Sequence, residues 1–223
     1  MASSRPRLAV LISGHGRNLQ AILAACADGR LPAEPACVIS SRPGVAGLAR
    51  AREAGVAAAV VAHTEHAGRE AFDHALAAVL ARERPDIIAL AGFMRVLGDG
   101  FIREFRGRML NIHPSLLPRH RGLHTHRRAL EAGDAEHGAS VHFVTEELDG
   151  GPVVIQGRFT VQPQDDEQSL AERTMREVEL KIFPQALAWM ARGELRLTGG
   201  AAQLRGRALA APLTLEDLEP EFR

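Results

Sequence analysis

An asparagine and a histidine stand two residues apart in the segment Asn111-Ile-His113-Pro-Ser-Leu-Leu-Pro, which follows a short apolar run. Alternate side chains of a strand project from the same face, so Asn111 and His113 share one face of any sheet that contains this run. In α/β sheets ligands bind at the carboxyl ends of the parallel strands. An amide and an imidazole aimed at one point can donate to a developing oxyanion. A histidine that contacts only local groups is the structural alternative.

A glycine-containing segment, Ser13-Gly-His-Gly-Arg-Asn-Leu19, separates a strand pattern from a helix pattern. Glycine lets the backbone approach a ligand, and the free amides of a first helical turn suit a phosphate. Leu19 stands where a dinucleotide fingerprint needs its third glycine, and no acid closes the next strand, which disfavours NAD. Arg42 follows that strand, so an NADP site stays open. A tight turn that binds nothing is the alternative.

A second glycine-flanked segment, Leu148-Asp149-Gly-Gly-Pro, contains a carboxylate. Such a carboxylate, here Asp149, can approach a histidine, raise the pKa of the imidazole and hold one tautomer. The alternative is an acidic hairpin turn, because Asp-Gly is a frequent turn sequence.

Six of the ten histidines lie between His113 and His142. Among them, His124-Thr-His126 has the spacing found in some metal hydrolases. The pair falls at a predicted helix start, however, and side chains two apart on a helix point in different directions. We therefore expect no metal.

Strand and helix patterns alternate along the chain, and these elements must position the groups above. Short apolar runs predict strands at 8–12, 36–40, 58–61, 87–90 and 109–112. Helices are predicted at 18–27, with Asn18 as the N-cap, and at 45–54, 69–84, 99–105 and 124–132. Such alternation predicts an α/β fold with a doubly wound, mostly parallel, Rossmann-like sheet.

The pattern changes in the last third of the chain. The β-rich segments 139–144 and 153–161 flank an acidic turn and predict an antiparallel C-terminal extension of the sheet. A long helix is expected over 169–191, with a kink or interruption at Pro184. The segment from Gly199 onward is rich in Gly, Ala, Arg and Pro and is expected to be loosely ordered.

Charge and composition exclude several classes of protein. Lys plus Arg and Asp plus Glu each number 27, so the formal net charge is zero. Without a basic excess and without tyrosine, binding to nucleic acid or to a membrane surface is not expected. Cys26 and Cys37 have no metal or disulfide spacing and are expected to be core residues. The first apolar run is too short for a signal or a membrane span, which predicts a cytoplasmic protein.

Five segments in this order make the chain similar to the phosphoribosylglycinamide formyltransferase family: Ser-Gly-x-Gly-x-Asn-Leu-Gln, Ala-Gly-Phe-Met-Arg, Asn-Ile-His-Pro-Ser-Leu-Leu-Pro, Gly-Leu-His-Thr-His and Ser-Val-His-Phe-Val-Thr-x-Glu-Leu-Asp-Gly-Gly-Pro. The resemblance extends from Leu8 to Leu197. It implies a formyltransferase fold and transfer of a formyl group from 10-formyltetrahydrofolate to the amine of glycinamide ribonucleotide, in de novo purine synthesis.

The resemblance also implies a role for each matching residue. The catalytic trio would be Asn111, His113 and Asp149, and the loop that carries Asp149 would be steadied by Ser140 and His142. The nucleotide would be held by Gly16, Arg17, Asn18, Leu19, Gln20, Pro114 and Glu179. The folate would be held by Arg69, Leu90, Met94, Arg95, Val96, Leu97, Asn111, Thr145, Glu146, Glu147 and Leu148. His15 and Arg17 depart from the family's loop, so Arg17 either adds charge for the phosphate or points to solvent.

The implied mechanism uses neither a metal nor a covalent intermediate. The amine attacks the formyl carbon directly, and His113, kept protonated by Asp149, stabilises the oxyanion together with Asn111. We expect one domain over 1–223, in which 8–105 bind phosphate and nucleotide, 106–197 carry catalysis and the folate, and 198–223 form a tail. The expected partners are small molecules, and the expected state is a monomer or homodimer.

Four other functions remain open. A 10-formyltetrahydrofolate hydrolase would share the trio and pass the formyl group to water, but usually has an added N-terminal domain. A methionyl-tRNA formyltransferase would need a C-terminal domain and a basic surface. A phosphate-binding module or an NADP-dependent reductase would use the glycine loop without the trio. Turnover of 10-formyl folate only in the presence of glycinamide ribonucleotide would separate the transferase from all of these.

Overall fold

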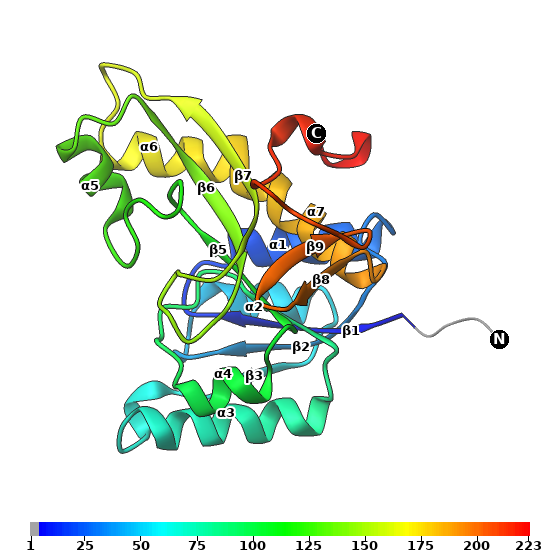
Figure 1. The fold of residues 1–223 in the computed structure, drawn as a ribbon. Coiled ribbons are helices and arrows are strands. Elements are labelled where there is room, and N and C mark those ends of the chain that lie inside the picture. Colours follow the sequence, from blue (N-terminus) through cyan, green and yellow to red (C-terminus); the bar gives the residue numbers. More distant parts are fainter. Residues whose placement is uncertain (1–4) are drawn as a thin grey trace.

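A seven-stranded sheet in the order β3-β2-β1-β4-β5-β6-β7 forms the centre of the computed structural model, which describes residues 5–223. The parallel strands are β1 (Arg7–Ile12), β2 (Glu34–Ser40), β3 (Ala58–Val60), β4 (Ile87–Leu90) and β5 (Met109–His113). β6 (Glu136–Phe143) pairs antiparallel with β5, and β7 (Val153–Thr160) pairs antiparallel with β6. The predicted doubly wound sheet and its antiparallel extension are both confirmed (Figure 1).

Helices cover both faces of this sheet (Figure 1). One face carries α1 (Arg17–Ala27), α2 (Ala46–Glu53) and α7 (Leu180–Ala191), and the other carries α3 (Arg69–Glu83) and α4 (Asp99–Glu104). Leu8, Val10 and Ile12 belong to the core under α1 and α7, whereas Ala9 and Leu11 belong to the core under α3 and α4. Because successive residues of β1 enter opposite cores, this strand is apolar throughout rather than alternating.

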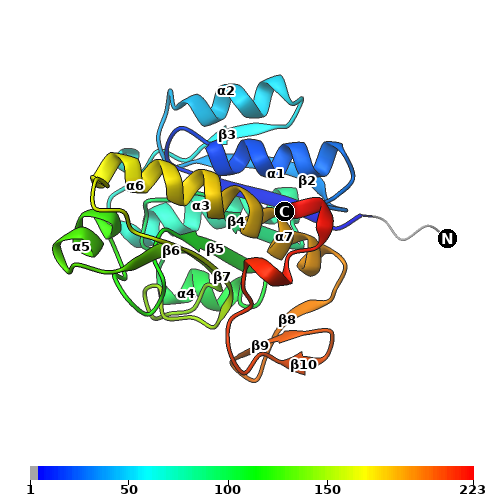
Figure 2. The same ribbon diagram turned by 90° about the horizontal axis from the view of Figure 1, so that it is seen from above.

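Smaller elements complete the chain. They are η1 (His63–Glu65), α5 (Thr125–Glu131), α6 (Glu167–Arg173), η3 (Leu215–Asp217) and η4 (Pro220–Phe222). β8 (Leu195–Thr198), β9 (Ala201–Leu204) and β10 (Arg207–Ala208) form a separate antiparallel sheet, which lies away from α5 and α6 (Figure 2).

The helix expected over 169–191 is interrupted, but not at Pro184. A π-helical segment, η2 (Thr174–Glu179), joins α6 to α7, and Pro184 lies inside α7. The hydroxyl of Thr174 donates to the carbonyl of Leu170 over 2.7 Å. Each π turn holds more residues than an α turn, so the segment changes the direction in which the following side chains point. The predicted position of the interruption was therefore wrong.

The segment after Gly199 is ordered, and the expectation of a loose tail was wrong. Leu213 exchanges backbone hydrogen bonds with the edge strand β7, and Leu218 and Phe222 are buried. The carboxylate of Glu219 accepts a hydrogen bond from Nε1 of Trp189 over 3.0 Å. Widely spaced apolar residues anchor this segment although its overall composition is polar and rich in turn formers.

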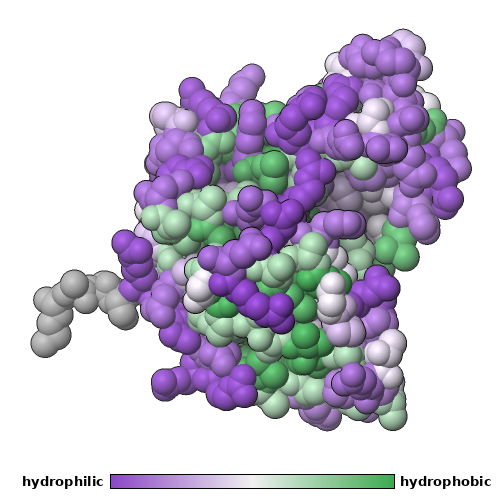
Figure 3. Space-filling view, turned by 180° about the vertical axis from the view of Figure 1, so that it is seen from behind, coloured by the Kyte–Doolittle hydropathy of each residue, from purple (hydrophilic) through white to green (hydrophobic). Residues whose placement is uncertain are grey.

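The outer surface mixes polar and apolar groups. Figure 3 shows the face opposite to that of Figure 1, on which apolar residues gather mainly in the lower half between charged ones. Such mixing is usual for folded proteins. Among residues 5–223, none of the helices combines the length and the apolar character that crossing a membrane requires.

Candidate active site

Three loops that follow β1, β4 and β5 meet at one edge of the sheet. The strand order reverses between β1 and β4, which are neighbours although two other strands separate them in sequence. Such switch points are where open α/β sheets bind ligands. Here a cleft of about 800 Å³ lies beside a smaller slot of about 100 Å³. Asn111 and Asp149 line both spaces, so the two join at these residues.

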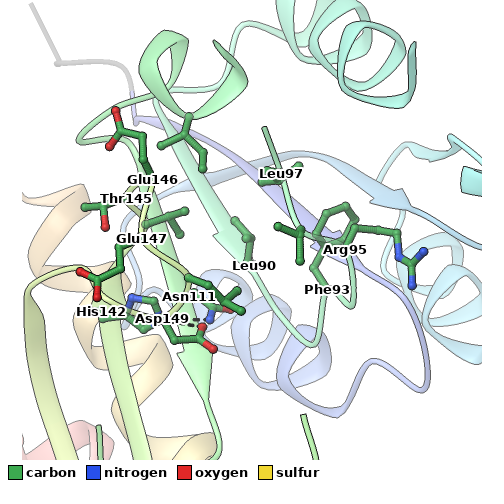
Figure 4. Close-up of a pocket in the computed structure, with 14 residues that line it drawn as sticks. Leu90, Phe93, Arg95, Leu97, Asn111, His142, Thr145, Glu146, Glu147 and Asp149 are labelled. Carbon is green, nitrogen blue, oxygen red and sulfur yellow. Dashed lines mark hydrogen bonds and ion pairs between the residues drawn. The ribbon is translucent and has the colours of Figure 1, made fainter. Parts of the chain in front are cut away.

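The catalytic trio expected from sequence comes together at this junction, and Figure 4 shows two of its members, Asn111 and Asp149, beside His142. Nδ1 of His113 lies 3.4 Å from Oδ2 of Asp149. The amide nitrogen of Asn111 lies 3.0 Å from Nε2 of His142, which is itself 3.6 Å from Oδ1 of Asp149. Asn111 and His113 occupy alternate positions of β5, as their spacing predicted, and His142 stands opposite Asn111 on β6.

His113 is buried and Asp149 is partly buried, and their surroundings favour a neutral imidazole and an ionised carboxylate. Burial lowers the pKa of His113, and the Asp149 carboxylate and the His120 carbonyl offset this only in part. The contribution of Asp149 has the direction expected from sequence, because its carboxylate favours the protonated imidazole. Burial alone would raise the pKa of Asp149, but His142, His113 and the N–H of Gly122 together lower it. Asp149 thus stays ionised at neutral pH.

Glycines hold Asp149 in place. Asp149 has a φ of 47°, in the left-handed region that a non-glycine residue seldom adopts. Its carboxylate accepts a hydrogen bond from the N–H of Gly122 over 2.9 Å. A Cβ added to Gly151 would lie 1.9 Å from the carbonyl oxygen of Phe143. Only glycine fits at 151, so the turn predicted from the Asp-Gly sequence also sets the position of the carboxylate.

Of the two residues expected to steady the loop of Asp149, only His142 contacts it. The hydroxyl of Ser140 instead donates to the carbonyl of Ser115 over 2.6 Å and accepts from the N–H of Leu117 over 3.1 Å. Nε2 of Gln156 also reaches the Leu117 carbonyl, over 2.7 Å. Ser140 therefore supports the turn that follows β5. Sequence reasoning missed Gln156, which only the pairing of β7 with β6 brings to this turn.

All eleven residues expected to hold a folate border the two spaces. Arg69 and Met94 line the cleft, and the others line the slot or both: Leu90, Arg95, Val96, Leu97, Asn111, Thr145, Glu146, Glu147 and Leu148. Leu90, Phe93 and Leu97 form an apolar wall in Figure 4, and the side chain of Arg95 extends away from the trio. Met94, Val96 and Leu148 are each more than half exposed, an arrangement typical of a ligand surface.

The residues expected to hold the nucleotide lie at the start of α1. Gly16 is the N-cap, with a φ of 75°, and a Cβ there would lie 2.8 Å from Cα of Gly47. Asn18 is inside the helix, so its predicted capping role was wrong. Its Nδ2 donates to Oε2 of Glu179 over 2.5 Å, and burial raises the pKa of Glu179. Pro114 lines the cleft itself.

Two cationic residues flank this helix start. Arg17 is exposed, and its charge acts on the Glu179 carboxylate. Arg50 of α2 donates from Nε to the carbonyl of His15 over 3.0 Å and also bonds the side chain of Gln20. Arg50 was not singled out from sequence. Its spacing on α2 relative to Gly47 was the available signal, because those two positions share one helix face.

The His-x-His pair has two different environments. His124 has a φ of 58° and is the N-cap of α5, whereas Nδ1 of His126 lies 2.9 Å from Nε2 of His137. Burial, with a smaller contribution from His126, lowers the pKa of His137 to about 4.

Comparison with known proteins gives the family. A family model described as formyl transferase matches residues 6–187. Phosphoribosylglycinamide formyltransferase of Escherichia coli (strain K12) is 46% identical over 202 residues, which cover 91% of this chain and 95% of the relative. The chain belongs to the phosphoribosylglycinamide formyltransferase family. The resemblance drawn from its motifs is thereby confirmed.

Other relatives and solved structures support the assignment. The trifunctional purine biosynthetic protein adenosine-3 of Drosophila melanogaster is 48% identical over 195 residues, covering 86% of this chain but 14% of that longer protein. Among solved structures, phosphoribosylglycinamide formyltransferase from Coxiella burnetii has a TM-score of 0.89 at 43% identity and covers 94% of this chain and 99% of its own. Glycinamide ribonucleotide transformylase 1 from Symbiobacterium toebii has a TM-score of 0.87 at 42% identity, covering 91% and 95%.

Proposed function

We propose that this chain transfers the formyl group of 10-formyltetrahydrofolate to the amine of glycinamide ribonucleotide, as a cytoplasmic enzyme of purine synthesis. One observation supports this most strongly: Asn111, His113 and Asp149 meet where the apolar slot opens into the cleft. A flat apolar ring fits the slot, and a polar acceptor reaches the trio through the cleft. The formyl carbon would then lie between donors for its oxygen and a carboxylate that can carry protons.

The reaction follows from these groups. The acceptor amine attacks the formyl carbon, and the carbonyl oxygen takes the negative charge. Nδ2 of Asn111 has two N–H groups, one directed at His142, so the second can donate to this oxygen. The oxyanion favours the charged form of His113, against the effect of burial, and the Nε2–H that now faces the His120 carbonyl becomes the second donor.

Protons move through Asp149. Because its pKa is lowered, the carboxylate is ionised and can accept a proton from the attacking amine, through a water molecule. It returns that proton to N10 of the folate as the bond between carbon and N10 breaks. The products are formyl-glycinamide ribonucleotide and tetrahydrofolate, and no group of the protein is consumed. The reaction needs no metal ion.

The remaining residues bind rather than react. The amides at the start of α1, together with Arg17, bind the nucleotide phosphate. The Glu179 carboxylate, held by the side-chain amide of Asn18, supplies an acceptor for the ribose hydroxyls. Arg69 and Arg95 face the acidic end of the folate.

A spectroscopic assay of 10-formyltetrahydrofolate tests this function. We expect turnover only when glycinamide ribonucleotide is present; turnover in water alone would show a hydrolase instead. His113→Ala and Asp149→Asn should each lower kcat by about 10²–10³-fold, the usual loss of an oxyanion donor or proton carrier. The exposed His74→Ala and Asp86→Asn are matched controls and should keep full activity. Near-normal turnover by either site variant would reject the mechanism.

A further inference from the structure

Asp73, on the buried side of α3, contacts a loop that sequence motifs did not connect with it. Its Oδ2 accepts a hydrogen bond from the N–H of Gly98 over 2.7 Å, and the residue is only 8% exposed. Gly98 directly follows Met94–Leu97, the segment that walls the slot. Burying a carboxylate whose two oxygens are not both hydrogen-bonded costs folding free energy, so a buried carboxylate beside a ligand site suggests a functional role.

The same segment is fixed at its other end. The N–H of Met94 donates to Oγ of Ser13 over 2.8 Å, and this hydroxyl pairs with that of Ser41 over 2.6 Å. Both serines are buried. Between the two anchors, Met94 and Val96 expose apolar side chains to the cleft, whereas Leu97 is buried in the core under α3 and α4. The exposed part of the wall is therefore held by Ser13 at one end and by Leu97 and Gly98 at the other.

The junction at Gly98 leaves no spare room. A Cβ built on Gly98 would lie 2.8 Å from Oδ2 of Asp73 and 3.6 Å from Nε of Arg69. Arg69 stands one turn before Asp73 on α3, and both it and Phe72 line the cleft. Phe72 stacks on Phe93 with 6.3 Å between ring centroids. One face of α3 thus contacts both the start and the end of the wall.

We propose that Asp73 is a positioning residue for the formyl donor: its hydrogen bond to Gly98 fixes Met94–Leu97 at the distance from Asn111 that the donor ring requires. This inference rests on the proposed function, because it takes the slot as the donor site. The second carboxylate oxygen, Oδ1, is buried and has no hydrogen-bond partner within residues 5–223. The charge of Asp73 also acts on Arg69, which lies beside the same junction.

Kinetics of two substitutions at Asp73 test the proposal. Asp73→Ala should raise the KM for 10-formyltetrahydrofolate about tenfold or more, with the KM for glycinamide ribonucleotide changed less than about twofold. Asp73→Asn keeps an oxygen acceptor for the N–H of Gly98 and should restore the donor KM to within about threefold of the wild-type value. Asp86→Ala is the control, because Asp86 also accepts from a backbone N–H, that of Arg7 over 2.7 Å, but before β4 at the opposite edge of the sheet. Its donor KM should not change.

Gly98→Ala perturbs the junction from the other side. Gly98 has a φ of −81°, which alanine adopts without strain, so the collision with Asp73 is the only new cost. The donor KM should rise in Gly98→Ala, and adding Asp73→Ala should raise it by less than the product of the two single effects. Equal changes of both KM values, or independent effects of the two substitutions, would overturn the proposal.

Hydrogen exchange separates this inference from the proposed function. Amide exchange over 94–98 should be faster in Asp73→Ala and normal in Asp86→Ala, whether or not the enzyme is active. If the wild-type protein transfers no formyl group, the proposed function fails while exchange still reports the anchor. If the wild-type protein is active but exchange and donor KM are unchanged in Asp73→Ala, the positioning role is wrong.

Discussion

Glu179 provides the sharpest test of how this site is built, because stability and activity should change in opposite directions. Glu179 is only 6% exposed. Its carboxylate accepts a short hydrogen bond from the side-chain amide of Asn18. Burial raises the pKa of Glu179, which means that the folded protein disfavours the charged form. Replacement by glutamine keeps an acceptor for Asn18 and removes the charge. We expect Glu179→Gln to increase the free energy of unfolding at pH 7.

The expected increase in unfolding free energy is about 1–3 kcal/mol, which is the usual cost of burying a polar group that is incompletely hydrogen-bonded. Its pH dependence has a fixed sign. Below the ordinary value of 4.5 both the folded and the unfolded wild type are protonated at Glu179, so the variant gains nothing from the loss of charge. As the pH rises above 4.5, the unfolded chain ionises first and the wild type loses stability. The advantage of glutamine should therefore grow from about pH 4 to pH 7.

Denaturant unfolding at pH 4 and pH 7 measures this difference, with the exposed Glu172→Gln of α6 as the control. The same Glu179→Gln protein should lose about 10- to 100-fold in kcat/KM for glycinamide ribonucleotide, since hydrogen bonds from substrate hydroxyls to a charged acceptor are worth about 1.5–3 kcal/mol. A variant less stable than wild type at pH 7, or a gain equal at both pH values, would refute the burial argument. Unchanged nucleotide kinetics would remove Glu179 from the binding site.

Three further outcomes follow from single contacts. Because the pKa of His137 is lowered to about 4 from 6.5, the folded protein should lose up to about 3 kcal/mol as the pH falls through this interval, and His137→Gln should flatten that loss in an unfolding series. Gly151→Ala should lower kcat more than about 10²-fold, because its Cβ would meet the Phe143 carbonyl at 1.9 Å and displace Asp149; full activity would contradict the assigned loop geometry. Glu219→Ala should reduce the unfolding free energy by about 2 kcal/mol and alter the fluorescence of Trp189, whose Nε1 it accepts from over 3.0 Å; an unchanged midpoint would show that this contact does not hold the tail.

The sequence by itself indicated a doubly wound, mostly parallel sheet with an antiparallel extension, and its motifs pointed to Asn111, His113 and Asp149. Apolar runs such as 8–12 and 87–90 can only be strands covered on both faces, and helices alternate with them, so the parallel fold follows from local pattern. Asn111 and His113 share a face because strand side chains alternate, which needs no tertiary information. The motifs, read in order, were sufficient to indicate the family.

Tertiary structure decided which distant groups meet. Asn18 and Glu179 are 161 positions apart, and Asp73 and Gly98 are 25 apart. Neither spacing carries a periodic signal, so no local pattern links these residues. The direction of the pKa shift of His113 also depended on folding, because burial, the largest cause, cannot be inferred from local sequence. The π segment that ends at Glu179 and the packed tail also depend on tertiary structure. Local propensity is weak in both, and contacts with α7 and β7 select their conformation.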